Sequence, residues 1–217
     1  MALLSEKDAA LVQEQFSDTL TGPVKMAVYT SKSDCTYCGE TMQIAEELAE
    51  LSDLISWEER DFDTDTHGLA VDKVPAIAIL GQDESGAEVD YGIRFYGIPS
   101  GYEFMSLLDA IQTVGGGKVE LSDDTLKFLD GLTEDVHIQV FVTPTCPYCP
   151  RAVILAHHLA FASARVHADM VEATEFPELS SRYNVMGVPR SVINDTVHQE
   201  GAVPEAMFLL KMQEAVA

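Results

Sequence analysis

The chain has 217 residues, a hydrophobic content of 47% and a formal net charge of −23, which arises from 13 basic and 36 acidic side chains. This length fits one or two domains, and so apolar a composition is sufficient for buried cores. No window approaches the roughly 18 uninterrupted apolar residues of a membrane helix, and the acidity argues against binding to the phosphates of nucleic acids. We therefore expect a globular protein with neither a membrane segment nor a nucleic acid partner.

The cysteines give the first indication of chemistry. Residues 1–16 contain three acidic side chains and lack a basic stretch, so they do not predict a signal peptide, and we expect a cytoplasmic protein. All four cysteines lie in Cys-x-x-Cys pairs, Cys35 with Cys38 and Cys146 with Cys149. In a chain without a secretory signal, such pairs beside alternating strands and helices indicate redox or metal chemistry rather than structural cross-links.

The hydrophobic pattern predicts the elements of the first half. A helix is expected from Ser5 to Leu20, with Ser5 and Asp8 in capping-box positions, and a buried strand from Val24 to Tyr29 follows it. An amphipathic helix comes after Cys38. Beyond this helix we predict a strand at Ile55 to Phe62, a short helix around Thr66 to Val71, strands at Ala76 to Leu80 and Val89 to Phe95, and a helix at Tyr102 to Val114.

A glycine triplet, Gly115 to Gly117, predicts a flexible break between two similar halves of the chain. The matching segments are, in order, Val24 to Tyr29 with Val136 to Val142, the two cysteine motifs, and Val74-Pro75 with Val188-Pro189. A last helix is expected at Glu205 to Ala215. We therefore predict two copies of one domain, at residues 1–115 and 118–217, each a mixed α/β sheet with helices on both faces.

The second cysteine motif predicts a redox dithiol. It reads Thr-Pro-Thr-Cys-Pro-Tyr-Cys-Pro from Thr143 to Pro150, between a predicted strand and a predicted helix. Two thiols at that spacing can close a small disulfide ring, and the first sulfur then faces free backbone N–H groups of the helix. Such motifs lower the pKa of the first thiol to between about 3.5 and 7.5, and the thiolate is the species that attacks a disulfide. Tyr37 and Tyr148, between the cysteines of each pair, form either a substrate-facing surface or a solvated turn.

The order of the elements, the Cys-x-x-Cys after the first strand and the later Val-Pro resemble the thioredoxin fold, twice. The segment Thr145 to Pro150 resembles the glutaredoxin signature, and Tyr183 to Pro189 is similar to the segment before the cis-proline of this superfamily. Tandem units with Cys-Pro-Tyr-Cys in the second resemble the glutaredoxin-like protein disulfide oxidoreductases of thermophilic archaea and bacteria. The resemblance implies two tandem thioredoxin-like units and thiol-disulfide exchange, with no cofactor beyond the redox-active disulfides.

The resemblance also implies roles for individual residues. Cys146 would be the attacking thiolate, and Cys149 the resolving thiol that displaces product from the mixed disulfide. Pro189 would be a cis-proline, and Val188 would offer its backbone to a substrate chain as the edge of a short strand. In the first unit, Cys35 would be the nucleophile and Cys38 the resolving thiol. Val74 and Pro75 would form the wall that contacts the substrate.

Neighbouring charges predict that the two dithiols are unequal. Arg151 comes closely after the second motif, whereas Asp34 and Glu40 flank the first. A cation stabilises a thiolate and carboxylates destabilise it, so we expect Cys146 to be the more reactive nucleophile. The first dithiol is expected to be redox-active because its spacing is intact; it could also relay electrons or have a structural role.

The proton acceptor of the resolving thiols is not evident. Six residues before the first cysteine of each motif, where thioredoxins place a buried acid, stand Tyr29 and Val140, and no tryptophan precedes either motif. A water or a nearby carboxylate would have to accept the proton.

The expected partners are protein disulfides or dithiols and a flavoprotein donor of the thioredoxin-reductase type, preferred over glutathione because so acidic a chain predicts no basic groove. A second hypothesis is an electron-transfer module between such a donor and a peroxiredoxin. Tandem thioredoxin folds also form part of alkyl hydroperoxide reductase flavoproteins, where the first unit typically lacks its cysteines. A redox-inert scaffold, or one structural zinc site formed by both cysteine pairs, are further alternatives, although a full repeat separates the pairs.

Other prominent side chains have plainer interpretations. His157 and His158 are expected at the surface of a helix or in its packed face rather than as ligands, and Arg190 either guides a carboxylate of a partner or is solvated. The side chains assigned to hydrophobic cores are Trp57, Met42, Met186 and Met207.

Overall fold

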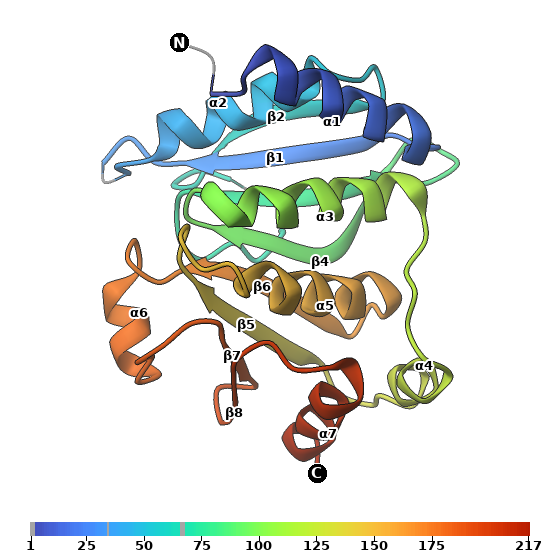
Figure 1. Cartoon of the computed structure of the whole chain (residues 1–217), viewed down its shortest axis with the longest axis vertical. Coiled ribbons are helices and arrows are strands. Elements are labelled where there is room, and N and C mark those ends of the chain that lie inside the picture. The colour runs from blue at the N-terminus through green and yellow to red at the C-terminus, as the bar shows by residue number, and fades with distance from the viewer. Residues whose placement is uncertain (1–2, 34, 66–67) are drawn as a thin grey trace.

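Every strand in the described part of the chain belongs to one mixed sheet. The computed structural model describes residues 3–33, 35–65 and 68–217. Across these residues the strands lie in the order β2-β1-β3-β4-β6-β5-β7-β8, and Figure 1 shows this sheet running through the molecule with helices packed against it. No helix in these ranges is both long and apolar enough to cross a membrane.

The order of elements in the first half recurs in the second. The first half contains α1 (Glu6–Thr19), β1 (Val24–Thr30), α2 (Cys38–Ala49), β2 (Ile55–Asp61), β3 (Ala76–Gln82), β4 (Glu88–Tyr96), the 3-10 helix η1 (Gly101–Glu103) and α3 (Phe104–Gly116). The second contains α4 (Asp123–Asp130), β5 (Val136–Val142), α5 (Cys149–Ala162), β6 (Val166–Glu172), α6 (Pro177–Arg182), β7 (Arg190–Ile193), β8 (Val197–Glu200) and α7 (Glu205–Ala215).

The start of α1 follows the predicted capping box. Ser5 Oγ accepts a hydrogen bond from the backbone N–H of Asp8 at 3.2 Å and donates one to Asp8 Oδ2 at 2.7 Å. Val12 and Phe16, one turn apart, are buried against the sheet. A side chain that satisfies an end amide and a buried apolar stripe together fix where this helix begins and which face it buries.

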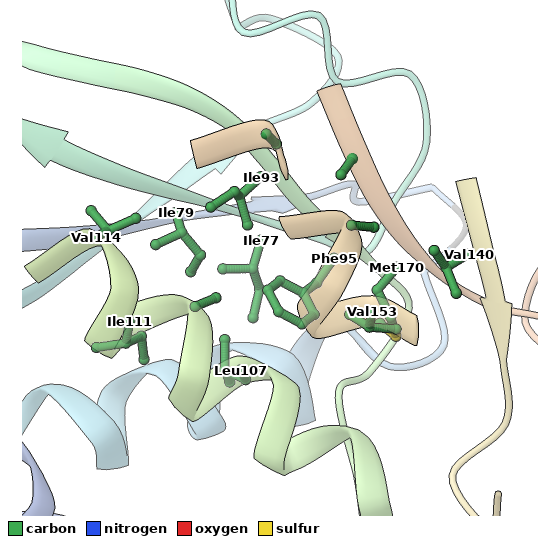
Figure 2. Close-up of a cluster of buried hydrophobic side chains, with 14 of the residues drawn as sticks. Ile77, Ile79, Ile93, Phe95, Leu107, Ile111, Val114, Val140, Val153 and Met170 are labelled. Atoms are coloured by element: carbon green, nitrogen blue, oxygen red, sulfur yellow. The ribbon is translucent and has the colours of Figure 1, made fainter. Parts of the chain in front are cut away.

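The two halves share a sheet and a core. β4 pairs in parallel with β6, with Ile93 opposite Ala168. In Figure 2, Phe95 of the first half lies in the same buried cluster as Val153 and Met170 of the second. The seam between the repeats is therefore packed like the interior of one domain.

The glycine triplet does not form the flexible break that the sequence predicts. Gly115 and Gly116 continue α3, and Gly117 ends the helix with a φ of 66°. A Cβ at Gly115 would meet Leu20 and Val24, and the Gly115 carbonyl accepts backbone hydrogen bonds from residues 21 and 22 at 2.9 Å each. Close packing of α3 on the turn after α1, together with a left-handed helix end, accounts for these glycines.

The two faces of the sheet are covered differently. The larger core lies beneath α1, α2, α3 and α5, which Figure 1 shows side by side. On the opposite face, α6 and residues 68–75 cover a second cluster that includes Tyr29, Tyr96 and Phe141. Part of the short helix predicted around Thr66 to Val71 lies outside the described residues, and residues 68–71 form no helix. Leu69 and Val71 pack on the second cluster instead, so packing decides the conformation of this segment.

Candidate active sites

Both cysteine pairs form disulfides at equivalent places in the fold. One joins Cys35, in the turn after β1, to Cys38, the first residue of α2; the other joins Cys146, after β5, to Cys149, the first residue of α5. The Cα atoms of each pair are 5.5 Å apart. Strands β1 and β5 run in the same direction through the sheet, so both disulfides lie at the same end of it.

In the second disulfide the two sulfurs differ in access. Cys146 is 8% exposed, whereas Cys149 is completely buried. The backbone N–H of Cys146 donates to the Thr143 carbonyl at 3.1 Å, and Cys146 Sγ lies 3.7 Å from the carbonyl oxygen of Val188. Cys146 is thus the less buried of the two cysteines, and the Val188 carbonyl lies beside its sulfur.

The environment of this dithiol follows the elements predicted from the sequence. The Val188–Pro189 peptide bond is cis. Helix α5 begins at Cys149 with Pro150 in its first turn, and no side chain caps it. The uncapped N-terminus of α5 therefore provides a positive helix-dipole end beside the cysteine pair.

The first disulfide repeats this arrangement. Cys35 is half-buried and Cys38 is buried, and the Val74–Pro75 peptide bond is cis. The Pro75 carbonyl accepts a hydrogen bond from the backbone N–H of Gly97 at 2.9 Å, which ties this wall to the end of β4. The expected influence of Asp34 on Cys35 lies outside the described residues.

A carboxylate from the second half reaches the surroundings of the first disulfide. Glu175 Oε1 accepts a hydrogen bond from the backbone N–H of Ile98 at 2.7 Å, and a Cβ at Gly97 would collide with this carboxylate. The pKa of Glu175 is raised to about 7, mainly by burial, with a smaller contribution from the neighbouring carboxylates of Glu172 and Glu40. Glu40 lies in the first turn of α2, so acidic groups from both halves gather near Cys38.

A second carboxylate with a raised pKa, Glu103, is one that the sequence did not reveal. It is buried in η1, and its Oε2 accepts a hydrogen bond from Ser106 Oγ at 2.7 Å. Among the described residues, its Oε1 has no hydrogen-bond partner. Burial raises the pKa of Glu103 to about 7. This carboxyl is therefore poised to gain or lose a proton near neutral pH.

Contacts between the two halves bring η1, the element that contains Glu103, close to the turn of the second disulfide. The backbone N–H of Tyr102 donates to the Pro144 carbonyl at 3.0 Å, two residues before Cys146. η1 also packs against α5, whose first residue is Cys149. The carboxyl and the dithiol come from different repeats, so sequence spacing within one repeat could not have associated them.

The exposed side chains partly correct the sequence predictions. Tyr37 and Tyr148 are exposed, as expected for residues between the cysteines. The assignment of Met186 and Met207 to hydrophobic cores is wrong, because Met186 is 84% exposed and Met207 is exposed as well. Met42 packs at the edge of the core.

The remaining side chains singled out from the sequence have structural roles. Trp57 packs against the larger core. The His157 ring is buried, packs edge-on against Phe95 at 4.8 Å, and its pKa is lowered to about 4 by burial. His158 Nε2 lies 2.8 Å from Asp109 Oδ2. Arg190 pairs with Glu200 at 2.6 Å, so it is neither a free guide for a partner nor fully solvated.

The two disulfides are too far apart to act as one site. Strands β3, β4 and β6 lie between β1 and β5. At about 4.8 Å per strand spacing, the two turns are separated by roughly 19 Å. A single tetrahedral zinc ion binds all four sulfurs at about 2.3 Å, so this separation contradicts the zinc alternative.

Comparison with known proteins agrees with this architecture. Residues 136–214 match the thioredoxin domain family. The alkyl hydroperoxide reductase AhpF from Xanthomonas campestris pv. phaseoli is 24% identical over 204 residues, which cover 93% of this chain and 36% of that protein. The chain spans between a quarter and about a third of the length of the curated relatives it matches.

Two solved structures superpose on almost the whole chain. The protein disulfide oxidoreductase from Aeropyrum pernix has a TM-score of 0.88 and 29% identity, covering 98% of this chain and 93% of that one. The NTD_N/C domain of alkylhydroperoxide reductase AhpF from Enterococcus faecalis has a TM-score of 0.85 and 28% identity, covering 99% and 100%. The fold and the resemblance expected from the sequence are thereby confirmed. The chain is a tandem thioredoxin-fold protein with two Cys-x-x-Cys disulfides, similar both to the Aeropyrum pernix oxidoreductase and to the AhpF domain.

Proposed function

We propose that the chain is a protein dithiol-disulfide oxidoreductase whose principal site is Cys146 and Cys149, with Val188, Pro189 and Tyr148 around the substrate. One observation carries the proposal. The sulfur of Cys146, the less buried cysteine, lies 3.7 Å from the Val188 carbonyl, while its partner Cys149 is completely buried. A substrate strand on the Val188 backbone would bring its own disulfide to the outer sulfur first.

In the reductive direction, the Cys146 thiolate attacks one sulfur of a substrate disulfide. The Cys146–substrate bond forms, the substrate S–S bond breaks, and one substrate thiolate leaves. Cys149 then loses its proton and attacks the Cys146 sulfur, which breaks the mixed disulfide and releases the second substrate thiolate. Two electrons have passed to the substrate, and the Cys146–Cys149 disulfide remains. The oxidative direction is the reverse of these steps.

Glu103 is the proton acceptor that we assign to Cys149. Its element packs against α5, its carboxyl is buried, and one of its oxygens lacks a partner among the described residues. A pKa of about 7 suits a group that takes a proton from a thiol at neutral pH and returns it later. In this arrangement the first repeat contributes directly to the chemistry of the second.

The first dithiol, Cys35 and Cys38 with Val74, Pro75 and Tyr37, is a second redox site of lower reactivity. The carboxylates of Glu40 and Glu175 gather near it, and negative charge disfavours the thiolate. We assign the two thioredoxin-like units to residues 1–115 and 118–217, with the shared sheet holding them together.

A second candidate function is electron transfer from a flavoprotein of the thioredoxin-reductase type to a peroxiredoxin. Similarity to the AhpF domain over 99% of this chain favours it. The sulfur chemistry would be the same, and the two functions differ in the partner that accepts the electrons. Either function needs only the redox-active disulfides of this chain and no further cofactor bound to it.

The proposal is tested by reduction of insulin with dithiothreitol as the electron source. We expect wild-type protein to catalyse it, Cys146→Ser to abolish it, and Cys35→Ser to retain most of it, since the second site is the principal one. A Cys146→Ser variant as active as wild type would contradict the assignment. Parallel turnover with a thioredoxin reductase and a peroxiredoxin distinguishes the two functions, because a dedicated electron carrier would serve the peroxiredoxin and leave insulin unreduced.

A further inference from the structure

The loop between β4 and η1, residues 97–100, connects the surroundings of the two dithiols. At its start, the backbone N–H of Gly97 donates to the Pro75 carbonyl of the first site at 2.9 Å. Just beyond its end, the N–H of Tyr102 donates to the Pro144 carbonyl, in the turn of the second dithiol, at 3.0 Å. We call this segment the bridging loop. Any displacement of it would be felt at both sites.

A side chain of the second repeat holds the bridging loop. Glu175 Oε1 accepts a hydrogen bond from the Ile98 N–H at 2.7 Å, and a Cβ at Gly97 would lie 2.8 Å from the same oxygen. Two backbone hydrogen bonds lead onward into η1. The Ile98 carbonyl accepts from the Ser100 N–H at 2.8 Å, and the Ser100 carbonyl accepts from the Glu103 N–H at 3.2 Å. The contact with Glu175 therefore bears on the position of Glu103.

Glu175 is itself fixed by its neighbours. Its N–H donates to Glu172 Oε2 at 2.6 Å, and the same oxygen accepts from Thr174 Oγ1 at 2.7 Å. Glu172 is buried. The Ala173 N–H donates to the Val142 carbonyl at 2.9 Å, which ties the segment after β6 to the end of β5. A carboxyl on a backbone that is already ordered loses little further conformational freedom when it holds a second segment.

We propose that Glu175 is a positioning residue for the second dithiol: its carboxyl oxygen fixes the bridging loop and so holds Glu103 where it accepts the proton of Cys149. The inference rests on the proposed function. The contact requires an oxygen at the right reach and no charge, because a neutral and an ionised carboxyl both accept a hydrogen bond. A misplacement of about 1 Å can cost on the order of 100-fold in rate. Reach at position 175 should therefore control the resolving step.

Two conservative variants separate reach from charge. Glu175→Gln keeps the length and an oxygen acceptor but removes the charge, whereas Glu175→Asp keeps the charge and is one methylene shorter. Both are made in the full chain with Cys35→Ser and Cys38→Ser, so that only the second dithiol reacts. The reduced protein is mixed with one equivalent of 5,5′-dithiobis(2-nitrobenzoate). The attack of Cys146 releases one thionitrobenzoate, and the attack of Cys149 on the mixed disulfide releases the other.

The second release carries the test. Glu175→Asp should slow it about tenfold, and Glu175→Gln should change it by less than about twofold. The first release should change by less than about twofold in both variants, because the attack of Cys146 does not use Glu103. The matched control is Glu178→Asp, on the exposed surface of α6, which should behave like the parent protein.

Every other pattern overturns the inference. A loss in Glu175→Gln with none in Glu175→Asp would mean that the charge matters and the contact does not. An unchanged second release in both variants would mean that Glu103 is held without Glu175. Losses in both variants, or equal losses in the first and second releases, would mean a general loosening of the fold. Failure of the proposed function itself is distinguishable, because the parent protein would then release neither thionitrobenzoate.

Discussion

At the scale of single residues, the cysteines are evident from the sequence, whereas the carboxyl that we propose as the proton acceptor of Cys149 is not. Cys146 and Cys149 are recognisable because their chemistry requires a fixed spacing at a helix start. Glu103 is not part of any comparable sequence motif. It is one of 36 acidic residues, and it differs from most of them only because the fold buries it. Its environment, and hence its pKa, is a product of tertiary contacts.

Replacing Glu103 by glutamine should slow the resolving step on the order of 100-fold, because a positioned general base is lost. In the wild type this step should accelerate as the pH rises through about 7, where Glu103 becomes able to accept a proton. The inflection should vanish in Glu103→Gln. Single-turnover release of the second substrate thiol, measured from pH 5.5 to pH 8.5 or so, checks this prediction.

The pH dependence of the free energy of unfolding provides an independent test of the Glu103 carboxyl. The pKa of Glu103 is raised in the folded state from 4.5 to about 7, so the folded state binds more protons between these values. The free energy of unfolding should therefore fall as the pH rises from about 4.5 to about 7, and Glu103→Gln should remove this part of the dependence. The control is Glu178→Gln on the exposed surface of α6. If both variants kept the wild-type profile, Glu103 would not be the titrating group.

At the scale of elements, local pattern predicts most boundaries and fails where packing competes with it. Capping and periodicity locate α1, and the last helix, α7, runs from Glu205 to Ala215 as predicted. The sequence predicts a helix at residues 68–71, yet this segment is not helical and packs against the second hydrophobic cluster. The sequence assigns Met186 to a core because methionine commonly fills core gaps, but Met186 lies in the loop before β7 and is exposed.

The short element η1 depends on a glycine. Gly101 has a φ of 61°, and a Cβ there would collide with the Pro144 carbonyl. Gly101→Ala should lower the free energy of unfolding by at least about 1–2 kcal/mol through the left-handed conformation alone. It should also slow insulin reduction, because a shift of η1 would carry Tyr102 and Glu103 away from the second dithiol.

Urea unfolding and the insulin assay measure the two effects. Gly131→Ala is the matched control, because Gly131 has a φ of −85° and the nearest atoms to its Cβ would be 3.5 Å away. This control should fold and react like wild type. If Gly101→Ala did the same, close contact between η1 and the second site would not matter for activity.

At the scale of the whole molecule, the shared sheet holds the two dithiols at the same end but out of reach of each other. Thiol-disulfide exchange requires one sulfur to attack another directly, and three strands lie between β1 and β5. Electrons should therefore pass between the two sites only when two protein molecules meet, or through a mobile partner.

This prediction can be checked by partial reduction of the wild-type protein followed by timed alkylation. The rate at which thiols redistribute between the two dithiols should be proportional to protein concentration. Mixing a reduced Cys146→Ser, Cys149→Ser variant with an oxidised Cys35→Ser, Cys38→Ser variant gives the purely intermolecular rate, which should match. A redistribution rate independent of concentration would show that one chain transfers electrons internally.

The sequence by itself determined what short-range chemistry dictates: the two cysteine pairs, the strand and helix around each, the Val-Pro walls and the repetition of the unit. These features depend on spacing along the chain, so they can be predicted without a structure. Only the tertiary structure decided how the repeats meet. Parallel pairing of β4 with β6 brings η1 beside Pro144 and Glu175 beside Gly97. Glu103 and Glu175 thus lie in elements that contact the other repeat, because burial and proximity arise between segments that no local pattern connects.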